Sequence, residues 1–266
     1  QEAPLGLAHA VMIADEYIGK EPFVMYLGDN LIMGGITDFV GEFQKNRPNA
    51  QILLARVGNP SAFGVAELDG GRVVRLEEKP KEPRSDLALV GVYMFDASVF
   101  EAVNSIKPSG RNELEITDAI QYLIDSGREV RAHEITGWWK DTGKLDDILE
   151  ANRMILEHAK RDIRGDVDGA SRIDGNVVVE EGASIEGSVL RGPLVIGRGS
   201  RIVRSYIGPF TSVYRDVTIQ NSEIEHSIIL ENSSIVNLGQ RMEKSLVGKN
   251  VEIVKGANIP KAYRFM

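Results

Sequence analysis

The sequence predicts two domains: a mixed, layered α/β domain over residues 1–163 and a parallel β-helix of hexapeptide repeats over residues 164–266. Two observations support this fold class. Up to about residue 165, segments with a helical period alternate with apolar, strand-like runs, which is the pattern of a layered α/β domain. Beyond it, aliphatic residues recur every six positions, and a sustained short repeat of this kind builds stacked coils.

Helices and strands alternate along the first domain. A helical face that begins at Leu7 stops at Gly19, and a second, short helix is expected around residues 39–43. The strand-like segments are 23–27, 51–56, 64–68, 72–77 and 89–95. The turn at Gly70 and Gly71 predicts a hairpin, and the apolar run that ends at Phe95 predicts a strand covered on both faces. A helix over 144–160 is expected to close this domain.

The six-residue period of the second domain recurs in four runs. These are Ile173, Val179 and Ile185; Ile196 and Ile202; Ile207, Val213 and Ile219; and Val247, Ile253 and Ile259. Residues i and i−2 of a strand share a face, so each hexad sends two side chains inward. A β-sandwich is the alternative, but its strands follow one another at about 8 to 12 residues. Segments 187–193 and 237–244 interrupt the period and are expected to be irregular coils or small loops.

Charge and composition argue against several classes of partner. The net charge of −8 argues against nucleic acid and against an acidic membrane surface, since both need a basic face. The chain has no cysteine, which leaves no disulfide framework and suits a reducing cytoplasm. The longest apolar run, Leu87 to Phe95, is far shorter than the ~20 residues that span a bilayer. No membrane segment and no signal peptide are expected.

Asp29 and Asp141 each follow an apolar run inside a glycine-flanked signature. The two signatures are Leu27-Gly28-Asp29-Asn30 and Trp139-Lys140-Asp141-Thr142-Gly143. A carboxylate on the turn after strand 23–27 lies at a carboxyl edge of the sheet, where open α/β sheets bind ligands. Mg²⁺ prefers one or two carboxylates together with water and substrate phosphates. The pair predicts a magnesium site, whereas either residue alone is typical of a turn.

Five segments resemble, in their order and spacing, the sugar-nucleotide pyrophosphorylases, and most closely the long-form thymidylyltransferases that act on glucose 1-phosphate. They are residues 1–10, 27–30, 112–118 and 139–143, together with Glu77-Glu78-Lys79-Pro80. The resemblance covers residues 1 to about 160. It implies a Rossmann-like nucleotidyltransferase sheet, a left-handed β-helix, and transfer from dTTP to glucose 1-phosphate that yields dTDP-glucose and pyrophosphate. UTP and other hexose 1-phosphates stay open, because one methyl group is worth only about 1 to 3 kcal/mol of discrimination.

The resemblance also implies roles for individual residues. Asp29 and Asp141 would hold the Mg²⁺ that bridges the reacting phosphates, while Lys79 would bind the sugar phosphate and Glu78 the sugar hydroxyls. The other expected substrate-binding residues are Gln1 and Gly6 at the base, Gly64, Gly91, Glu113 and Trp139 at the sugar, and Arg111 at a phosphate. The alternatives without a role in binding are a solvated charge pair for Glu78 and Lys79, and a core position for Trp139.

One family feature has no counterpart in the sequence. The Gly-rich loop that carries Arg and Lys and cradles the triphosphate, Gly-x-Gly-x-x-Arg, is not found. The chain also starts without Met and stops at Met266 within the repeat. We interpret it as an internal fragment, or as the ordered portion, of a longer protein whose N-terminal segment carries that loop. Little or no transferase activity is expected without that loop, because the triphosphate loses backbone N–H donors.

The β-helix allows two further interpretations. His226 is the only histidine in the repeat region, and hexapeptide acyltransferases use a histidine as general base, so acetyl transfer is an alternative function. A histidine on a coil surface is more often a solvated polar residue. If the helix is purely structural, its flat faces suit self-association, and a homo-oligomer, trimer or tetramer, is expected.

Overall fold

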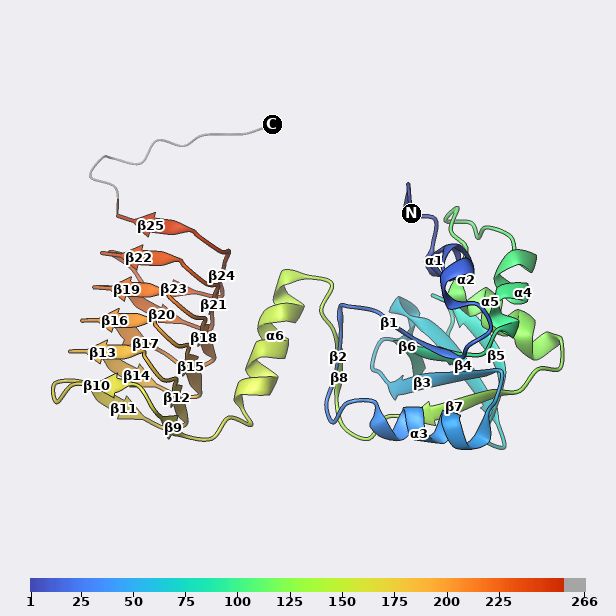
Figure 1. Ribbon diagram of the computed structural model, residues 1–266, viewed down its shortest axis with the longest axis horizontal. Helices are drawn as coiled ribbons and strands as arrows, with labels where there is room; N and C mark the ends of the chain where they lie inside the picture. The colour runs from blue at the N-terminus through green and yellow to red at the C-terminus, as the bar shows by residue number, and fades with distance from the viewer. Residues whose placement is uncertain (256–266) are drawn as a thin grey trace. The chain divides into compact units, whose positions relative to one another are not determined.

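The computed structural model describes residues 1–255 and divides the chain into two compact units, Gln1–Asp141 and the part from Thr142 onward (Figure 1). Each unit is built around its own apolar core. Ile259, the last member of the predicted six-residue period, lies outside the described residues. No helix within residues 1–255 combines the length and the apolar character needed to cross a membrane.

The first unit contains a six-stranded mixed sheet in the order β1-β6-β3-β7-β5-β4. Its strands are β1 (Phe23–Tyr26), β3 (Ala50–Arg56), β4 (Gly64–Asp69), β5 (Arg72–Glu78), β6 (Leu87–Phe95) and β7 (Val130–Glu134). Its helices are α1 (Leu7–Ile13), α2 (Asp15–Ile18), α3 (Thr37–Asn46), η1 (Pro60–Ala62), α4 (Ser98–Ser105) and α5 (Ile116–Asp125). The strand β3 pairs in parallel with β7, and the other pairings of this sheet are antiparallel.

Helices cover both faces of this sheet, which explains why its longest strand, β6, is apolar throughout. All nine residues of β6 are buried, as expected from the run without alternation. Along β3, Ile52 and Leu54 join the core beneath α1, α4 and α5, whereas Leu53 and Ala55 join the core beneath α3. The predicted hairpin is confirmed as β4 and β5. The predicted helix that begins at Leu7 is interrupted at Ala14 and forms two short helices.

A separate two-stranded sheet joins two segments that lie far apart in the sequence. It pairs β2 (Asn30–Ile32) with β8 (Trp139–Asp141) in antiparallel register, so that Asn30 lies opposite Asp141 and Ile32 opposite Trp139. This pairing brings together the two glycine-flanked signatures that contain the predicted magnesium ligands.

The second unit begins with α6 (Leu145–Leu156) and continues as a parallel β-helix of three sheets (Figure 1). One sheet contains β10 (Asp166–Val167), β13 (Ser184–Glu186), β16 (Arg201–Val203), β19 (Thr218–Gln220), β22 (Ser234–Val236) and β25 (Glu252–Val254). The second contains β11 (Arg172–Asp174), β14 (Val189–Arg191), β17 (Tyr206–Ile207), β20 (Glu223–Glu225) and β23 (Met242–Glu243). The third contains β9 (Asp162–Ile163), β12 (Val177–Val179), β15 (Leu194–Ile196), β18 (Thr211–Val213), β21 (Ile228–Ile229) and β24 (Leu246–Val247).

A coil of this β-helix is mostly 17 residues long. Leu194 pairs with Val177 on one side and with Thr211 on the other, 17 positions away in each direction. Three hexads would make eighteen, so most coils are one residue short and the six-residue phase breaks there. A few coils span 16 or 18 residues, as from Ser212 to Ile228 and from Ser234 to Glu252. The segment 187–193, which we expected to be an irregular coil or small loop, contains the regular strand β14, so that expectation was wrong. In the segment 237–244, residues 237–241 form no strand, as expected of a small loop, and the two-residue strand β23 follows.

The corners of the β-helix need left-handed backbone conformations. Residues with positive φ recur in three columns: Gly187, Arg204, Asn221 and Asn237; Gly175, Phe210, His226 and Lys244; and Gly182, Gly199, Asp216, Asn232 and Asn250. Glycine, asparagine and aspartate tolerate this region best, and they supply most of these positions. His226 is therefore a corner residue, at φ 48°, and its ring packs 5.1 Å from that of Phe210.

The helix that we expected to close the first domain packs on the second unit. The side-chain amide of Asn152 on α6 donates a hydrogen bond of 3.0 Å to the carbonyl of Phe210 and accepts one of 2.6 Å from the hydroxyl of Ser212. The Arg153 guanidinium lies 5.9 Å from the centre of the Phe210 ring. These contacts fix α6 against the coil that contains β18.

Replacing Gly197 by alanine tests how closely the coils approach one another. A Cβ at Gly197 would lie 2.6 Å from the carbonyl carbon of Tyr214 on the next coil, so the substitution is expected to lower the free energy of unfolding by about 1–3 kcal/mol. Gly248 occupies the same column, and its nearest neighbour would be 3.7 Å away. Chemical denaturation of Gly248→Ala should show a change below about 0.5 kcal/mol. Equal losses in both variants would contradict this explanation.

Candidate active site

A pocket of about 200 Å³ opens on the first unit. Several elements contribute to it: β2 and β8 of the small sheet, the ends of β4 and β5, the middle of β6, and the start of α5. The sequence-predicted residues that line it are Gly64, Glu78, Lys79, Gly91, Arg111, Trp139 and Asp141. Seven of the eleven expected site residues are thus brought together, from segments spread over most of the first domain.

The two aspartates lie on adjacent segments of the small sheet. Asp141 faces Asn30 across the pairing of β2 with β8, and Asp29 directly precedes Asn30. No cluster of three or more acidic or histidine side chains suited to a metal occurs within residues 1–255. Two carboxylates fit a Mg²⁺ site of the kind that takes its other ligands from water and substrate phosphates.

Asn30 connects the groups of this site and was not among the expected residues. The residue is largely buried, with 9% of its surface exposed. Its Nδ2 donates to Asp29 Oδ1 at 2.9 Å, while its Oδ1 accepts from the Gly91 N–H at 2.9 Å and from Trp139 Nε1 at 2.6 Å. The Asn30 amide thereby orients the Asp29 carboxylate, the backbone of β6 at Gly91 and the Trp139 ring. The only sequence signal for it is its position after Asp29 in the first signature.

At two glycines of the pocket, neighbouring protein atoms leave no room for a side chain. A Cβ at Gly91 would lie 2.5 Å from Asn30 Nδ2, and one at Gly64 would lie 2.8 Å from the Thr117 methyl group. We expected Gly64 to leave room for a hexose. The structure gives a further reason for its small size, because any larger residue would displace Thr117 and approach the Glu78 carboxylate at 3.2 Å.

A cluster of charges closes one side of the pocket. Arg111 Nη2 lies 3.2 Å from Glu78 Oε1 and 2.8 Å from Glu115 Oε2. The Glu115 side chain is only 6% exposed and also accepts a 2.6 Å hydrogen bond from the Ser109 hydroxyl. Glu115 thus holds Arg111 in place, although the sequence analysis did not single it out. Lys79 Nζ is 3.9 Å from Glu78 Oε1.

Burial raises the pKa of the Glu78 carboxyl above its usual value of 4.5, and the negative charge of Glu115 raises it further. The positive charges of Lys79 and Arg111 lower this pKa, but by less. Because the pKa in the folded state is raised, ionising Glu78 costs stability as the pH rises through that value. The unfolding free energy of wild type relative to Glu78→Gln should therefore fall as the pH rises from below 4.5 toward neutral. Denaturant titrations at several pH values measure it. A constant difference would contradict a perturbed Glu78.

Four expected site residues do not line the pocket: Gln1, Gly6, Asp29 and Glu113. The Gln1 amide donates to the Gly6 carbonyl at 2.9 Å. Gly6 has φ 98°, and a Cβ there would overlap the backbone of Leu114. Its glycine is thus explained by the packing of the N-terminal segment on Leu114. Glu113 lies 3.5 Å from Arg111 Nη2, at the rim of the charged cluster.

Residues 1–158 match the nucleotidyl transferase family, which covers more than half of the chain. The chain belongs to the nucleotidyl transferase family. Over its whole length it is 50% identical to glucose-1-phosphate thymidylyltransferase from Streptomyces griseus and 54% identical to the enzyme of the same name from Streptomyces antibioticus. The alignments cover 75% of each relative. The resemblance seen in the five sequence motifs is confirmed.

A solved structure supports the same family. It is a putative glucose-1-phosphate thymidylyltransferase from Bacillus anthracis in complex with a sucrose, similar to this chain at 37% identity with a TM-score of 0.52. The match covers 56% of this chain and 60% of that one. These relatives support sugar nucleotidyl transfer as the reaction class, with a nucleoside triphosphate and a sugar phosphate as the family's substrates. Nucleotidyl transferases of this family generally depend on Mg²⁺.

Proposed function

We propose that the protein transfers a thymidylyl group from dTTP to glucose 1-phosphate and releases pyrophosphate, giving dTDP-glucose. The observation that carries the proposal is the pairing of β2 with β8, which places Asp141 opposite the residue that follows Asp29, at the edge of a pocket containing Glu78 and Lys79. Relatives of that name at 50% and 54% identity support the choice of base and sugar.

The chemistry needs positioning more than proton transfer. A phosphate monoester has a second pKa of about 6, so the attacking oxygen of glucose 1-phosphate is already an anion at neutral pH. It attacks the α-phosphorus of the triphosphate, and the bond to the leaving pyrophosphate breaks. The protein has to align the two phosphates and offset their charge. When bound, Mg²⁺ supplies part of that offset.

The residues of this chain divide that work. Asp29 and Asp141 are proposed to hold Mg²⁺, Lys79 to bind the phosphate of the sugar phosphate, and Glu78 to accept hydrogen bonds from sugar hydroxyls. Four more residues that line the pocket are proposed to bind the substrates. Gly64, Gly91 and Trp139 would contact the sugar, and Arg111 a phosphate. For Gln1, Gly6 and Glu113, which lie outside the pocket lining, the proposed contacts to base and sugar depend on the family resemblance alone.

Several properties of the whole protein belong to the same proposal. We propose that residues 1–163 carry the transferase function and residues 164–266 the left-handed β-helix. The flat faces of stacked coils favour a homo-oligomer, a trimer or a tetramer. A reducing cytoplasm is the proposed compartment, because the chain contains no cysteine.

Pyrophosphate release by the protein carrying the family's Gly-x-Gly-x-x-Arg loop tests the assignment, because little or no activity is expected without that loop. We expect turnover with dTTP and glucose 1-phosphate in the presence of Mg²⁺, and a lower kcat/KM with UTP, by about 10- to 200-fold if the pocket recognises the thymine methyl. A panel of galactose, mannose and glucosamine 1-phosphates tests the sugar. Preferential use of UTP, or of another hexose 1-phosphate, would replace the proposed substrates.

A further inference from the structure

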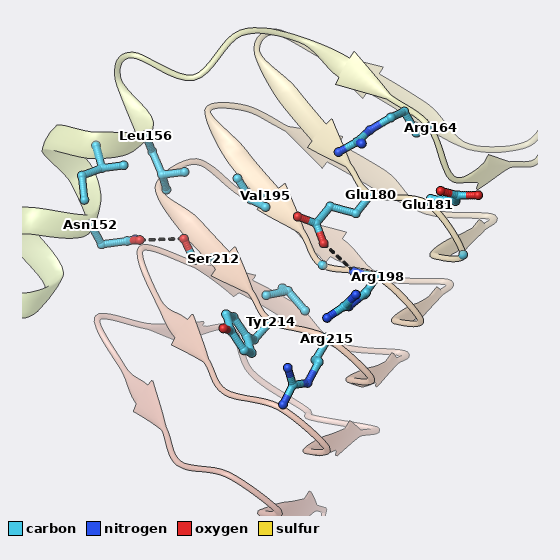
Figure 2. A pocket seen from close by; sticks show the side chains of 14 residues that line it. Asn152, Leu156, Arg164, Glu180, Glu181, Val195, Arg198, Ser212, Tyr214 and Arg215 are labelled. Carbon is cyan, nitrogen blue, oxygen red and sulfur yellow. Dashed lines mark hydrogen bonds between the residues drawn. The ribbon is translucent and has the colours of Figure 1, made fainter.

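A groove lies on the second unit, between α6 and the wall of the β-helix (Figure 2). Its volume is about 830 Å³, which lies within the roughly 300–1,000 Å³ of small-molecule sites. Asn152, Ile155 and Leu156 of α6 form one side, and residues of successive coils form the other. All the lining residues belong to the second unit, so the groove is separate from the pocket of the first.

Two arginines stand at the same corner of consecutive coils. Ile196 pairs in register with Val213, and Arg198 and Arg215 each follow two positions later. Successive coils stack about 4.8 Å apart, so the two positive charges at this corner repel one another. Arg215 is partly offset by Glu231 at 3.7 Å. Within residues 1–255, the Arg198 guanidinium forms no ion pair. Glu180 and Glu181 also line the groove, but its three arginines, Arg164, Arg198 and Arg215, outnumber them, and an anion would offset this excess of positive charge.

Apolar and aromatic surface adjoins the two cations. Tyr214 is 52% exposed and Ile155 is 51% exposed, and both residues line the groove together with Val195. Figure 2 shows Tyr214 and Arg215 on the same side of the groove as Arg198. Aromatic rings stack well on such a surface. Glu180, whose carboxylate accepts a 2.9 Å hydrogen bond from the Arg198 backbone N–H, adds an acceptor for hydroxyl groups.

We propose that this groove binds a nucleoside diphosphate. The diphosphate lies at Arg198 and Arg215, where guanidinium groups recognise phosphate oxygens by paired hydrogen bonds. The base packs on Tyr214 and Ile155, and the sugar hydroxyls face Glu180. Inorganic phosphate alone would use only the arginines and would leave the apolar part of the groove uncovered. The proposal is independent of the substrates assigned to the first unit.

Methyl NMR of the full chain tests the site locally. Thymidine diphosphate is expected to shift the methyl signals of Ile155 and Val195 in a saturable way, separately from the signal of Val92 in the first unit. The double variant Arg198→Gln, Arg215→Gln should weaken this binding at least 10-fold. The corresponding double lysine variant, which keeps the charge, should weaken it less. Arg172→Gln removes an exposed arginine outside the groove and should leave the affinity unchanged.

Four outcomes would overturn the proposal. The first is the absence of a saturable shift at Ile155 and Val195, and the second is an unchanged affinity in the double glutamine variant. The third is equally tight binding of inorganic pyrophosphate, which would refute the nucleoside part. The fourth is a set of shifts that depend on protein concentration without ligand, which would assign the groove to a second copy of the chain.

Thermal unfolding without ligand separates a binding role from a structural one. Because Arg198 has a like-charged neighbour and forms no ion pair within the described chain, Arg198→Gln is expected to leave Tm unchanged or to raise it. A structural role would lower Tm instead. A clear loss of stability in this variant would contradict the inference that the arginine serves a bound anion.

Discussion

Replacing Asp141 by alanine in the protein that carries the family's Gly-rich loop is expected to lower kcat/KM at least about 100-fold while leaving the fold intact. The substitution removes one of the two carboxylates proposed to hold Mg²⁺, and a 100-fold loss corresponds to about 2.7 kcal/mol of transition-state stabilisation. Asp141 is the last residue of β8, at the end of a two-stranded sheet, so the core strands of the first unit are not disturbed. Pyrophosphate release as a function of Mg²⁺ concentration measures the effect.

A matched substitution identifies losses that are not specific to the site. Asp146 lies in the first turn of α6, outside the pocket, and Asp146→Ala should retain nearly full activity. Circular dichroism and Tm check that both variants are folded. If Asp141→Ala turns over at the wild-type rate with an unchanged dependence on Mg²⁺, Asp141 has no part in the mechanism.

Replacing Asn30 by alanine is expected to lower the free energy of unfolding by about 2–4 kcal/mol and to lower kcat as well. The change leaves the Gly91 N–H and the Trp139 indole N–H without their acceptor, and a buried donor without a partner costs about 1–3 kcal/mol. It also removes the donor that orients Asp29. Urea denaturation and steady-state kinetics on the same preparations measure the two effects.

Two comparisons separate stability from catalysis at this position. Asn104→Ala removes a single hydrogen bond from α4 to the Phe100 carbonyl and should cost no more than about 1 kcal/mol. Asn30→Asp keeps an oxygen acceptor for Gly91 and Trp139 but replaces the donor to Asp29 by a second carboxylate. It should therefore affect kcat more than stability. A stability change below about 0.5 kcal/mol in Asn30→Ala would contradict the role assigned to Asn30.

The parts of the fold that the sequence predicted depend on local patterns. The buried strand β6 was evident from its unbroken apolar run, and the β4–β5 hairpin from its glycine turn. The partners of buried polar groups were not evident, because they come from distant segments. Asn30 bonds to Gly91 and Trp139, 61 and 109 positions away, and no local pattern reports such contacts. The ion pair between Glu115 and Arg111 was missed because the segment 112–118 contains two glutamates, and its sequence does not show which of them, Glu113 or Glu115, is the functional acid.

The β-helix shows a different limit of sequence analysis. Its six-residue period was correct within the described part of each run, but the usual coil length of 17 is visible only in the register between strands. The positive φ values at Arg204 and Phe210 were also unexpected, because neither residue type favours that region. The helix α6 was located correctly, but its packing partner depends on contacts such as that between Asn152 and Phe210.

The recurrence of the corner columns makes the coil the natural unit of length in this part of the protein. Removing or duplicating one complete coil would bring every corner back into its own column, whereas deleting a residue inside a strand would reverse which side chains of that strand face the core. The β-helix can therefore be lengthened or shortened by whole coils. The coils that carry the groove can be transplanted onto another solenoid with the same repeat length.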